Sequence, residues 1–426
     1  MAGIYFHIPF CKTRCMYCDF FSTITNDQLA MTNYVNALCQ ELQQRKDYLQ
    51  NQPIETIYFG GGTPSQLPPA AFEKIFIALS SVMLNNHAPV MSTGAEWALA
   101  RSAKWRHLMP TSTIEITLEA NPDDLTDAYL ESISHLPFNR LSIGIQSFDD
   151  KELRFLNRRH TAQEAIQAVE RAQKYGFDNI SIDLMYGLPN QTLETWQATL
   201  NQAIKLGVQH ISAYHLIYEE GTALHQLLEQ GKIAPVDEDT SIELFEMLID
   251  TLAAAGFQQY EISNFAQPGY ESRHNSAYWS GKHYLGIGAS AHSYNGVSRQ
   301  WNSYQLPVTS YQLPVTSYQL PVTKCHSHAG GKQRSAVANP LHYAPEIEMI
   351  DEKTAYNDFI ITRLRTMKGI NLDELVALFG EKQKTNCLLQ AQRSLDRGLL
   401  TISDNHLRLT RAGIFISDTL MTDLMR

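Results

Sequence analysis

Short apolar segments that alternate with helical patterns are the feature that most constrains the fold of this chain. Helical periodicity is clearest at residues 32–49, 162–175 and 193–206. Alternation of this kind is typical of βαβ units built on a parallel sheet. Six such units predict an α/β fold, an incomplete (β/α)6 barrel rather than an eight-stranded one. The expected strands are residues 3–8, 54–59, 114–119, 140–146, 179–186 and 210–218.

Polar or glycine-rich motifs follow five of these strands. Three cysteines follow the first, and Gly60-Gly-Gly-Thr-Pro-Ser65 follows the second. Glu119-Ala-Asn-Pro-Asp123, Gln146 and the segment 183–189 stand at the ends of the next three. A glycine triplet alone would be weak evidence, because glycine is a common turn former. Five motifs at strand ends predict a functional site along the carboxyl edge of the sheet.

The cysteines Cys11, Cys15 and Cys18 have the spacing Cys-x3-Cys-x2-Cys. Three thiolates this close can hold three irons of a [4Fe–4S] cluster and leave the fourth iron open, whereas an electron-transfer cluster normally has four cysteines. A zinc site usually pairs its ligands and needs a fourth. A disulfide framework would require an even count and a secreted context. The open corner predicts a metal centre that binds another molecule and acts on it.

Composition narrows the class of protein. A chain of 426 residues can bury one large domain and a smaller one. Neither a secretory leader nor an apolar run of eighteen residues is apparent, and cluster-binding thiolates require a reducing compartment, so we expect a cytoplasmic protein. The net charge of −10 argues against nucleic acid as a partner. Cys39 is expected in the hydrophobic core. Cys325 with His326 and His328 suggests metal binding by composition alone, which is weak evidence for a site.

Two insertions and a second domain are predicted. The barrel and its extension occupy residues 1–300, with an insertion at 85–113. An exposed insertion at 303–340 contains Ser-Tyr-Gln-Leu-Pro-Val-Thr three times, and its prolines exclude a continuous helix. Residues 350–426 predict a winged-helix-like α+β domain, with little basic excess and therefore a structural or docking role. Its expected elements are helices at 356–365, 372–378, 385–397 and 411–425 and a hairpin at 398–402 and 406–410.

The segment Cys11–Cys18, called the cysteine loop below, is followed by Gly60-Gly-Gly-Thr-Pro64, called the glycine loop. Together these two segments resemble the radical S-adenosylmethionine (SAM) superfamily. Tyr5-Phe-His-Ile-Pro-Phe-Cys11, Gly144-Ile-Gln-Ser-Phe148, Asn157-Arg-Arg-His160 and the segment 183–189 resemble its oxygen-independent coproporphyrinogen III oxidase branch. The final domain is similar to the HemN C-terminal domain of that branch. The resemblance implies a radical SAM barrel with a [4Fe–4S] cluster and SAM as cofactors, where SAM chelates the open iron and its C5′–S bond is cleaved.

Within this branch, the chain most resembles the haem chaperones of the HemW type. The oxidase pattern has a fourth cysteine where this chain has Phe20, and a segment before the first strand that this chain lacks. His274-Asn-Ser-Ala-Tyr-Trp279 matches a chaperone motif, which implies haem as cargo with His274 in contact with it. The implied partners are haem-accepting respiratory proteins at the membrane surface, with a homodimer as an open alternative. Anaerobic coproporphyrinogen III dehydrogenase activity, or radical SAM chemistry on another substrate, remain the competing interpretations.

The resemblance also assigns residues. Cys11, Cys15 and Cys18 would be the cluster ligands. Arg158 would match the methionyl carboxylate of SAM, and Asp183 would accept from its ribose. For Glu119, Arg158 and Asp183, the alternative is an internal charge network that caps the strands. The implied SAM contacts are Tyr5, Tyr17, Gly61, Gly62, Thr63, Glu119, Gln146, Arg158, Asp183 and Ile217.

Overall fold

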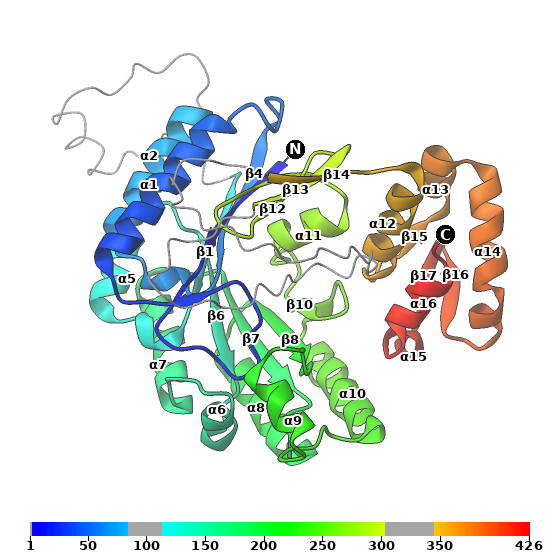
Figure 1. Ribbon diagram of the computed structural model, residues 1–426. Helices are drawn as coiled ribbons and strands as arrows, with labels where there is room; N and C mark the ends of the chain where they lie inside the picture. The colour runs from blue at the N-terminus through cyan, green and yellow to red at the C-terminus, as the bar shows by residue number, and fades with distance from the viewer. Residues whose placement is uncertain (1, 84–112, 303–344) are drawn as a thin grey trace.

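Six parallel strands form the centre of the computed structural model, which describes residues 2–83, 113–302 and 345–426 (Figure 1). They lie side by side in chain order, and each pairs in parallel with the next. The predicted α/β fold with a mostly parallel sheet is therefore confirmed, and each expected strand lies within a few residues of an observed one. These strands are β1 (Ala2–Ile8), β4 (Ile54–Gly61), β5 (Glu115–Ala120), β6 (Arg140–Gln146), β7 (Ile180–Tyr186) and β8 (His210–His215).

Helices cover the outer face of this sheet. Helix α1 begins four residues before the predicted start, because the Asp27 side chain accepts from the backbone N–H groups of Leu29 and Ala30 and so caps it. In Figure 1, α1 and α2 lie together at one side of the sheet. The connecting helices are α1 (Gln28–Gln44), α2 (Pro69–Met83), α5 (Asp127–Ser134), α6 (Asp150–Phe155), α7 (Ala162–Lys174) and α8 (Leu193–Lys205).

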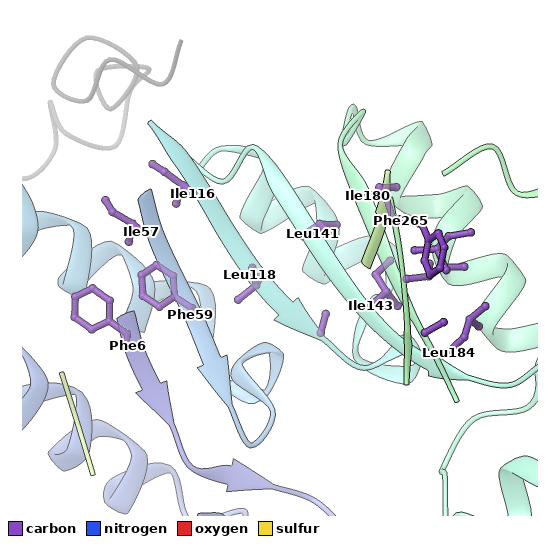
Figure 2. Packing of buried hydrophobic residues seen from close by; sticks show 14 of the residues in the cluster. Phe6, Ile57, Phe59, Ile116, Leu118, Leu141, Ile143, Ile180, Leu184 and Phe265 are labelled. Atoms are coloured by element: carbon purple, nitrogen blue, oxygen red, sulfur yellow. The ribbon is translucent and has the colours of Figure 1, made fainter. Parts of the chain in front are cut away.

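The main hydrophobic core lies between the sheet and these helices. Figure 2 shows apolar side chains from successive strands, including Phe6, Phe59, Leu118 and Ile143, which are fully buried. Phe59 packs edge-on against Phe72 of α2, with ring centroids 5.4 Å apart. Burial of this kind stabilises the fold by roughly 25 cal/mol per Å² of apolar surface. The core therefore holds the strand ends, where the polar motifs lie, in fixed positions.

Short strands extend the sheet at both edges and were not predicted. The described residues form a sheet of twelve strands in the order β14-β13-β12-β11-β1-β4-β5-β6-β7-β8-β10-β9. Arg45, directly after α1, fixes one extension, since it pairs with Glu41 and donates to the Gly286 carbonyl oxygen and the Ser293 hydroxyl. The added strands are β9 (Gln258–Gln259), β10 (Asn264–Ala266), β11 (His283–Ile287), β12 (His292–Tyr294), β13 (Ser298–Asn302) and β14 (Pro345–Met349); β2 (Phe10–Cys11) pairs separately with β3 (Thr23–Ile24).

The C-terminal elements pack beside the sheet, at the right of Figure 1. They are α12 (Glu352–Leu364), β15 (Ile370–Asn371), α13 (Leu372–Phe379), α14 (Glu381–Asp396), β16 (Leu400–Ser403) and β17 (His406–Leu409). The predicted last helix at 411–425 is in fact two helices, α15 (Arg411–Ile414) and α16 (Ser417–Asp423). The chain turns between them where Phe415 packs against Phe245, with ring centroids 5.2 Å apart.

Three further helices lie between β8 and this region in the sequence: α9 (Ala223–Glu229), α10 (Glu238–Ala254) and α11 (Arg273–Trp279). Arg363 of α12 donates to the carbonyl oxygens of Trp279 and Ser280, and Arg365 pairs with the buried Glu261 at 3.3 Å. None of the described helices is long and apolar enough to cross a membrane. The insertion predicted at 85–113, apart from its last residue, the insertion at 303–340 and the cluster Cys325, His326 and His328 lie outside the described residues.

Candidate functional site

A cavity of about 420 Å³ opens where the carboxyl ends of the parallel strands meet. This volume is in the range of small-molecule sites. Segments that are far apart in the sequence supply its walls, as the motif positions predicted. Twelve of the fourteen predicted site residues line it: Cys11, Cys15, Tyr17, Cys18, Gly61, Gly62, Thr63, Glu119, Gln146, Arg158, Asp183 and Ile217.

The cysteine loop is held against the barrel by contacts along its length. The Met16 backbone N–H donates to the Leu156 carbonyl oxygen at 3.2 Å, and Leu224 donates to the Met16 carbonyl oxygen at 3.0 Å. The Asn157 side-chain amide donates to the Arg14 carbonyl oxygen at 2.8 Å. Asn157 has a left-handed φ of 58°, which aims its side chain back at the loop. The loop is thereby shaped by residues outside it.

All three thiols face the cavity as free cysteines. Burial raises the pKa of the Cys11 thiol, and it raises that of the Cys18 thiol to about 12. These groups would therefore release protons as iron binds. Among the described residues, no three ligand side chains converge on one point as a single metal ion would require. A cluster places each cysteine on a different iron and can leave one iron open, so three thiols on one loop suit it, whereas zinc would need a fourth ligand.

The glycine loop lies closer to the end of β1 and to Pro9, directly after it, than side chains would allow. Gly61 has a φ of 114°, and a Cβ there would lie 2.6 Å from the His7 ring. A Cβ on Gly62 would lie 2.8 Å from the Pro9 backbone. The N–H groups of Gly62 and Thr63 donate to the carbonyl oxygens of Ile8 and Phe10. With its donors engaged internally, this loop can offer carbonyl oxygens to a ligand amine.

Two half-buried carboxyl groups, Glu119 and Asp183, line the cavity floor. Glu119 accepts from the Tyr58 hydroxyl at 2.7 Å and from the Gly61 N–H at 3.2 Å. Burial, with a contribution from Asp183, raises the pKa of Glu119 to about 7. Burial also raises the pKa of Asp183 to about 6. A cation bound beside these groups would favour their ionised forms, so the floor is suited to a positively charged ligand.

Arg158 and Gln146 form the wall next to the cysteines. Arg158 donates to Cys15 Sγ at 3.3 Å, to Asn121 Oδ1 at 2.6 Å and to the Gly144 carbonyl oxygen. Gln146 ends β6 with a left-handed φ of 74°, where the β6–β7 register shifts. A residue that is not glycine pays for this conformation, and such strain is common at functional sites. The strain turns Gln146 toward the cavity and away from the regular strand.

The two remaining predicted residues, Tyr5 and His274, do not line this cavity. They belong to an aromatic column in which the His274 ring stacks on Tyr58 with centroids 4.8 Å apart. His274 is 2% exposed, and both of its ring nitrogens have hydrogen-bond partners, Thr56 Oγ1 at 2.8 Å and the Tyr278 hydroxyl at 2.9 Å. Burial lowers the pKa of His274 to about 3, so the ring is neutral. Coordination of haem iron would first require Nε2 to leave Tyr278.

Sequence reasoning missed several residues of the site. Asn121 and Asp123 belong to the motif at the end of β5, and Arg159 to the segment after β6, yet only Glu119 and Arg158 were assigned from these motifs. Their position beside assigned residues was the available signal. A second, polar cavity of about 50 Å³ lies inside the barrel and shares Glu119 and Asp183 with the first. Asn275, next to His274 in the sequence, lines it.

Comparison with known proteins agrees with this geometry. The family model of the radical SAM superfamily matches residues 5–203, and that of the HemN C-terminal domain matches residues 350–416. The haem chaperone HemW of Bacillus subtilis is 37% identical over 303 residues, which cover 71% of this chain and 73% of that protein. This chain belongs to the HemW family.

Other members of the HemW family are similar in sequence to this chain over different lengths. HemW of Mycobacterium tuberculosis is 32% identical over 426 residues, covering 99% of this chain and 94% of its own. HemW of Escherichia coli is 37% identical over 292 residues, 68% of this chain and 69% of its own. The structure of the radical SAM enzyme coproporphyrinogen III oxidase (HemN) from Escherichia coli superimposes with a TM-score of 0.74 at 20% identity, over all of this chain and 90% of that one. The likeness to HemN shows a shared fold.

Proposed function

We propose that this chain is a haem chaperone that holds a [4Fe–4S] cluster on Cys11, Cys15 and Cys18 and binds SAM in the same cavity. One observation carries the proposal: the three thiols, the glycine loop and the carboxyl groups of Glu119 and Asp183 line a single cavity at the strand ends. The family relation to HemW supports haem as the cargo. A bound cluster would supply an electron to SAM at its open iron.

The residues of this chain would orient SAM and exclude water from it. Glu119 and Asp183 would face its positive charge, and the Gly61–Gly62 backbone would accept from its amine. Arg158, which contacts Cys15 Sγ in this structure, would turn to the methionyl carboxylate. Tyr17 would cover the cysteine side, and Ile217, 63% exposed at the mouth, would pack on the adenine. We propose that Glu119, Arg158 and Asp183 bind a ligand in this way, and are not only an internal charge network that caps the strands.

We further propose transfer of haem to respiratory proteins at the membrane surface, in a reducing compartment such as the cytoplasm, where the cysteines stay reduced. Phe20 supports the chaperone over the dehydrogenase, since it is 58% exposed at the cavity and offers no fourth thiolate. Carriage of haem at His274 is a separate proposal, because the ring nitrogens are engaged. Self-association as a homodimer also stays a proposal.

The test is anaerobic reconstitution with iron and sulfide, iron analysis, and electron paramagnetic resonance (EPR) after reduction of the cluster by dithionite. We expect about four irons per chain in the wild type. We expect none of the EPR signal after Cys11, Cys15 and Cys18 are replaced together by alanine. Cys39→Ala is the matched control, because Cys39 lies on α1 away from the cavity, and it should keep the cluster. A cluster that survives the triple substitution would refute the metal site.

An assay of the reconstituted protein then distinguishes a haem chaperone from a coproporphyrinogen III dehydrogenase. It is incubated with SAM, a strong reductant and coproporphyrinogen III, beside an active oxidase, and products are read by mass spectrometry. We expect no protoporphyrinogen from this chain, and a shifted haem absorption band when haem is titrated instead. Conversion of coproporphyrinogen would make the protein a dehydrogenase and overturn the chaperone proposal.

A further inference from the structure

Asp124 ends η2 (Pro122–Asp124), directly after the cavity-lining Asp123, and is contacted by side chains from three loops. Lys12 of the cysteine loop forms an ion pair with its Oδ1, and the Ser65 hydroxyl donates to Oδ2 at 2.8 Å. Arg159, from the segment after β6, places Nη2 3.6 Å from Oδ1. The Asp124 side chain is 3% exposed. One buried carboxylate therefore joins the loops that follow β1, β4 and β6.

The neighbouring groups strengthen this arrangement. The Asn121 N–H donates to the Ser65 hydroxyl at 3.2 Å, so Ser65 is itself fixed to the end of β5. Arg159 also pairs with Asp123 at 2.6 Å, which holds the guanidinium next to Asp124. A buried carboxylate is stable only when paired, and here two cations and a hydroxyl converge on it. Loss of its charge would leave Lys12 and Arg159 without this shared partner.

Lys12 lies next to Cys11 in the sequence. Among the described residues, its bond to Asp124 is the one ion pair formed by the segment that carries the three cysteines. The other contacts of that segment are hydrogen bonds: backbone bonds to the barrel, Arg14 on the Cys18 carbonyl oxygen, and the Thr63 hydroxyl and Arg158 on the thiols of Cys11 and Cys15. The cysteine loop is thus clamped on its Cys11 side by charge and on its Cys15 side by the barrel backbone.

We propose that Asp124 is a positioning residue that holds the cysteine loop in its cluster-binding shape before iron enters and that slows the release of iron afterwards. This inference rests on the proposed cluster site, to which it adds a residue that touches neither iron nor SAM. It works through Lys12, whose side chain is 41% exposed and would otherwise move freely in solvent. Preorganisation of ligands by surrounding residues is the usual requirement of a metal site.

The experiment measures iron release from the reconstituted full-length protein to an iron(II) chelator under anaerobic conditions. The variants are Asp124→Asn, Lys12→Gln and the double variant. Asp250→Asn is the control, since it removes an exposed carboxylate paired with Arg411 far from the cavity. Unfolding of the cluster-free proteins in urea is followed in parallel, so that general stability is measured separately from iron release.

We expect Asp124→Asn to release iron about tenfold faster than the wild type, and Lys12→Gln about threefold faster. The double variant should be no faster than Asp124→Asn, because both substitutions remove the same contact. Asp250→Asn should release iron at the wild-type rate. The EPR signal of the reduced cluster should broaden in Asp124→Asn as the loop samples more conformations.

Other results overturn the inference. Iron release from Asp124→Asn at the wild-type rate, or effects of the two substitutions that simply add, would show that Asp124 does not act through Lys12. If Asp124→Asn does not fold, Lys12→Gln still tests the proposal, because its side chain is partly exposed. An unchanged rate of iron release from Lys12→Gln would refute the proposal. A wild-type protein that takes up no iron would instead refute the cluster site itself, and this inference with it.

Discussion

The two ends of the same strands have opposite characters. At the carboxyl end of β5, Glu119 lines a cavity, its pKa is raised to about 7, and the neighbouring strand ends in the strained Gln146. At the amino end of β5, Glu115 accepts from the N–H groups of Arg273 and His274 at 3.0 Å and so caps α11. Among the described residues, Glu119 forms no ion pair, whereas Glu115 is buried and caps the amino end of α11.

The difference between the two strand ends indicates which end can bind a ligand. At the carboxyl edge, Arg158 Nε and Asp123 Oδ1 are buried without a hydrogen-bond partner among the described residues, and active sites of such barrels lie at this edge. At the amino edge, His274 already has a partner on each ring nitrogen. On this basis we propose that the carboxyl edge binds the cofactors and that the amino edge stabilises the fold. The following predictions test that division.

The largest effect is expected for His274→Ala. It removes two buried hydrogen bonds and a stacked ring, so we expect the free energy of unfolding to fall by about 3 kcal/mol. Urea unfolding monitored by circular dichroism measures this change. Tyr278→Phe, which keeps the ring but frees His274 Nε2, should cost only about 1 kcal/mol.

Haem titration of the same two variants tests whether the amino edge is only structural. If the amino edge is structural, folded Tyr278→Phe should bind haem with the wild-type absorption spectrum. Tighter haem binding by Tyr278→Phe, together with a lost haem band in His274→Ala, would show that His274 leaves Tyr278 to ligate iron. The chaperone motif would then be a haem site that opens on binding.

A smaller effect is expected for Glu119→Gln. SAM should bind about tenfold more weakly, because a neutral amide no longer faces its positive charge. In the wild type, a proton occupies Glu119 below about pH 7, so SAM affinity should fall with decreasing pH. The variant should lose most of this dependence near pH 7. Isothermal titration between pH 6 and 8 measures it, with Glu115→Gln as the control, whose SAM affinity should match the wild type.

The same substitution changes stability in a defined direction. The pKa of Glu119 rises from its ordinary 4.5 in the unfolded chain to about 7 in the folded one, so the folded state binds the extra proton. The wild type should therefore gain stability as pH falls from about 7 toward 4.5, by at most roughly 3 kcal/mol from this group. Glu119→Gln should flatten that rise. An unchanged pH profile of urea unfolding would show that Glu119 titrates normally.

The smallest effect is expected for Gln146→Gly. Glycine adopts a φ of 74° without strain, and we expect the protein to gain about 0.5 kcal/mol in unfolding free energy. SAM affinity should fall a few-fold through loss of the amide. Thermal unfolding and SAM titration measure the two quantities. Lower stability in this variant would mean that Gln146 contributes packing that outweighs its strain.

Much of the fold could be predicted from the sequence because the central strands are continuous apolar runs, and buried parallel strands leave that signal. The β6 prediction matches the observed bounds, Arg140–Gln146. The short strands β9 to β14 carry no such run and depend on contacts such as those of Arg45. The last helix was predicted as one because local periodicity does not show the packing of Phe415 on Phe245.

By itself, the sequence determined the chemistry of the carboxyl edge. The spacing of Cys11, Cys15 and Cys18 and the motifs at the strand ends identify ligand types, because parallel strands must bring their carboxyl ends together. Only the tertiary structure decided which motif residues face the cavity. The rings of Tyr5 and His274 instead stack on each other. The Asp124 carboxylate pairs with Lys12 and Arg159 and accepts a hydrogen bond from Ser65. The physical reason is that burial and partner choice depend on residues distant in the chain, which no local pattern records.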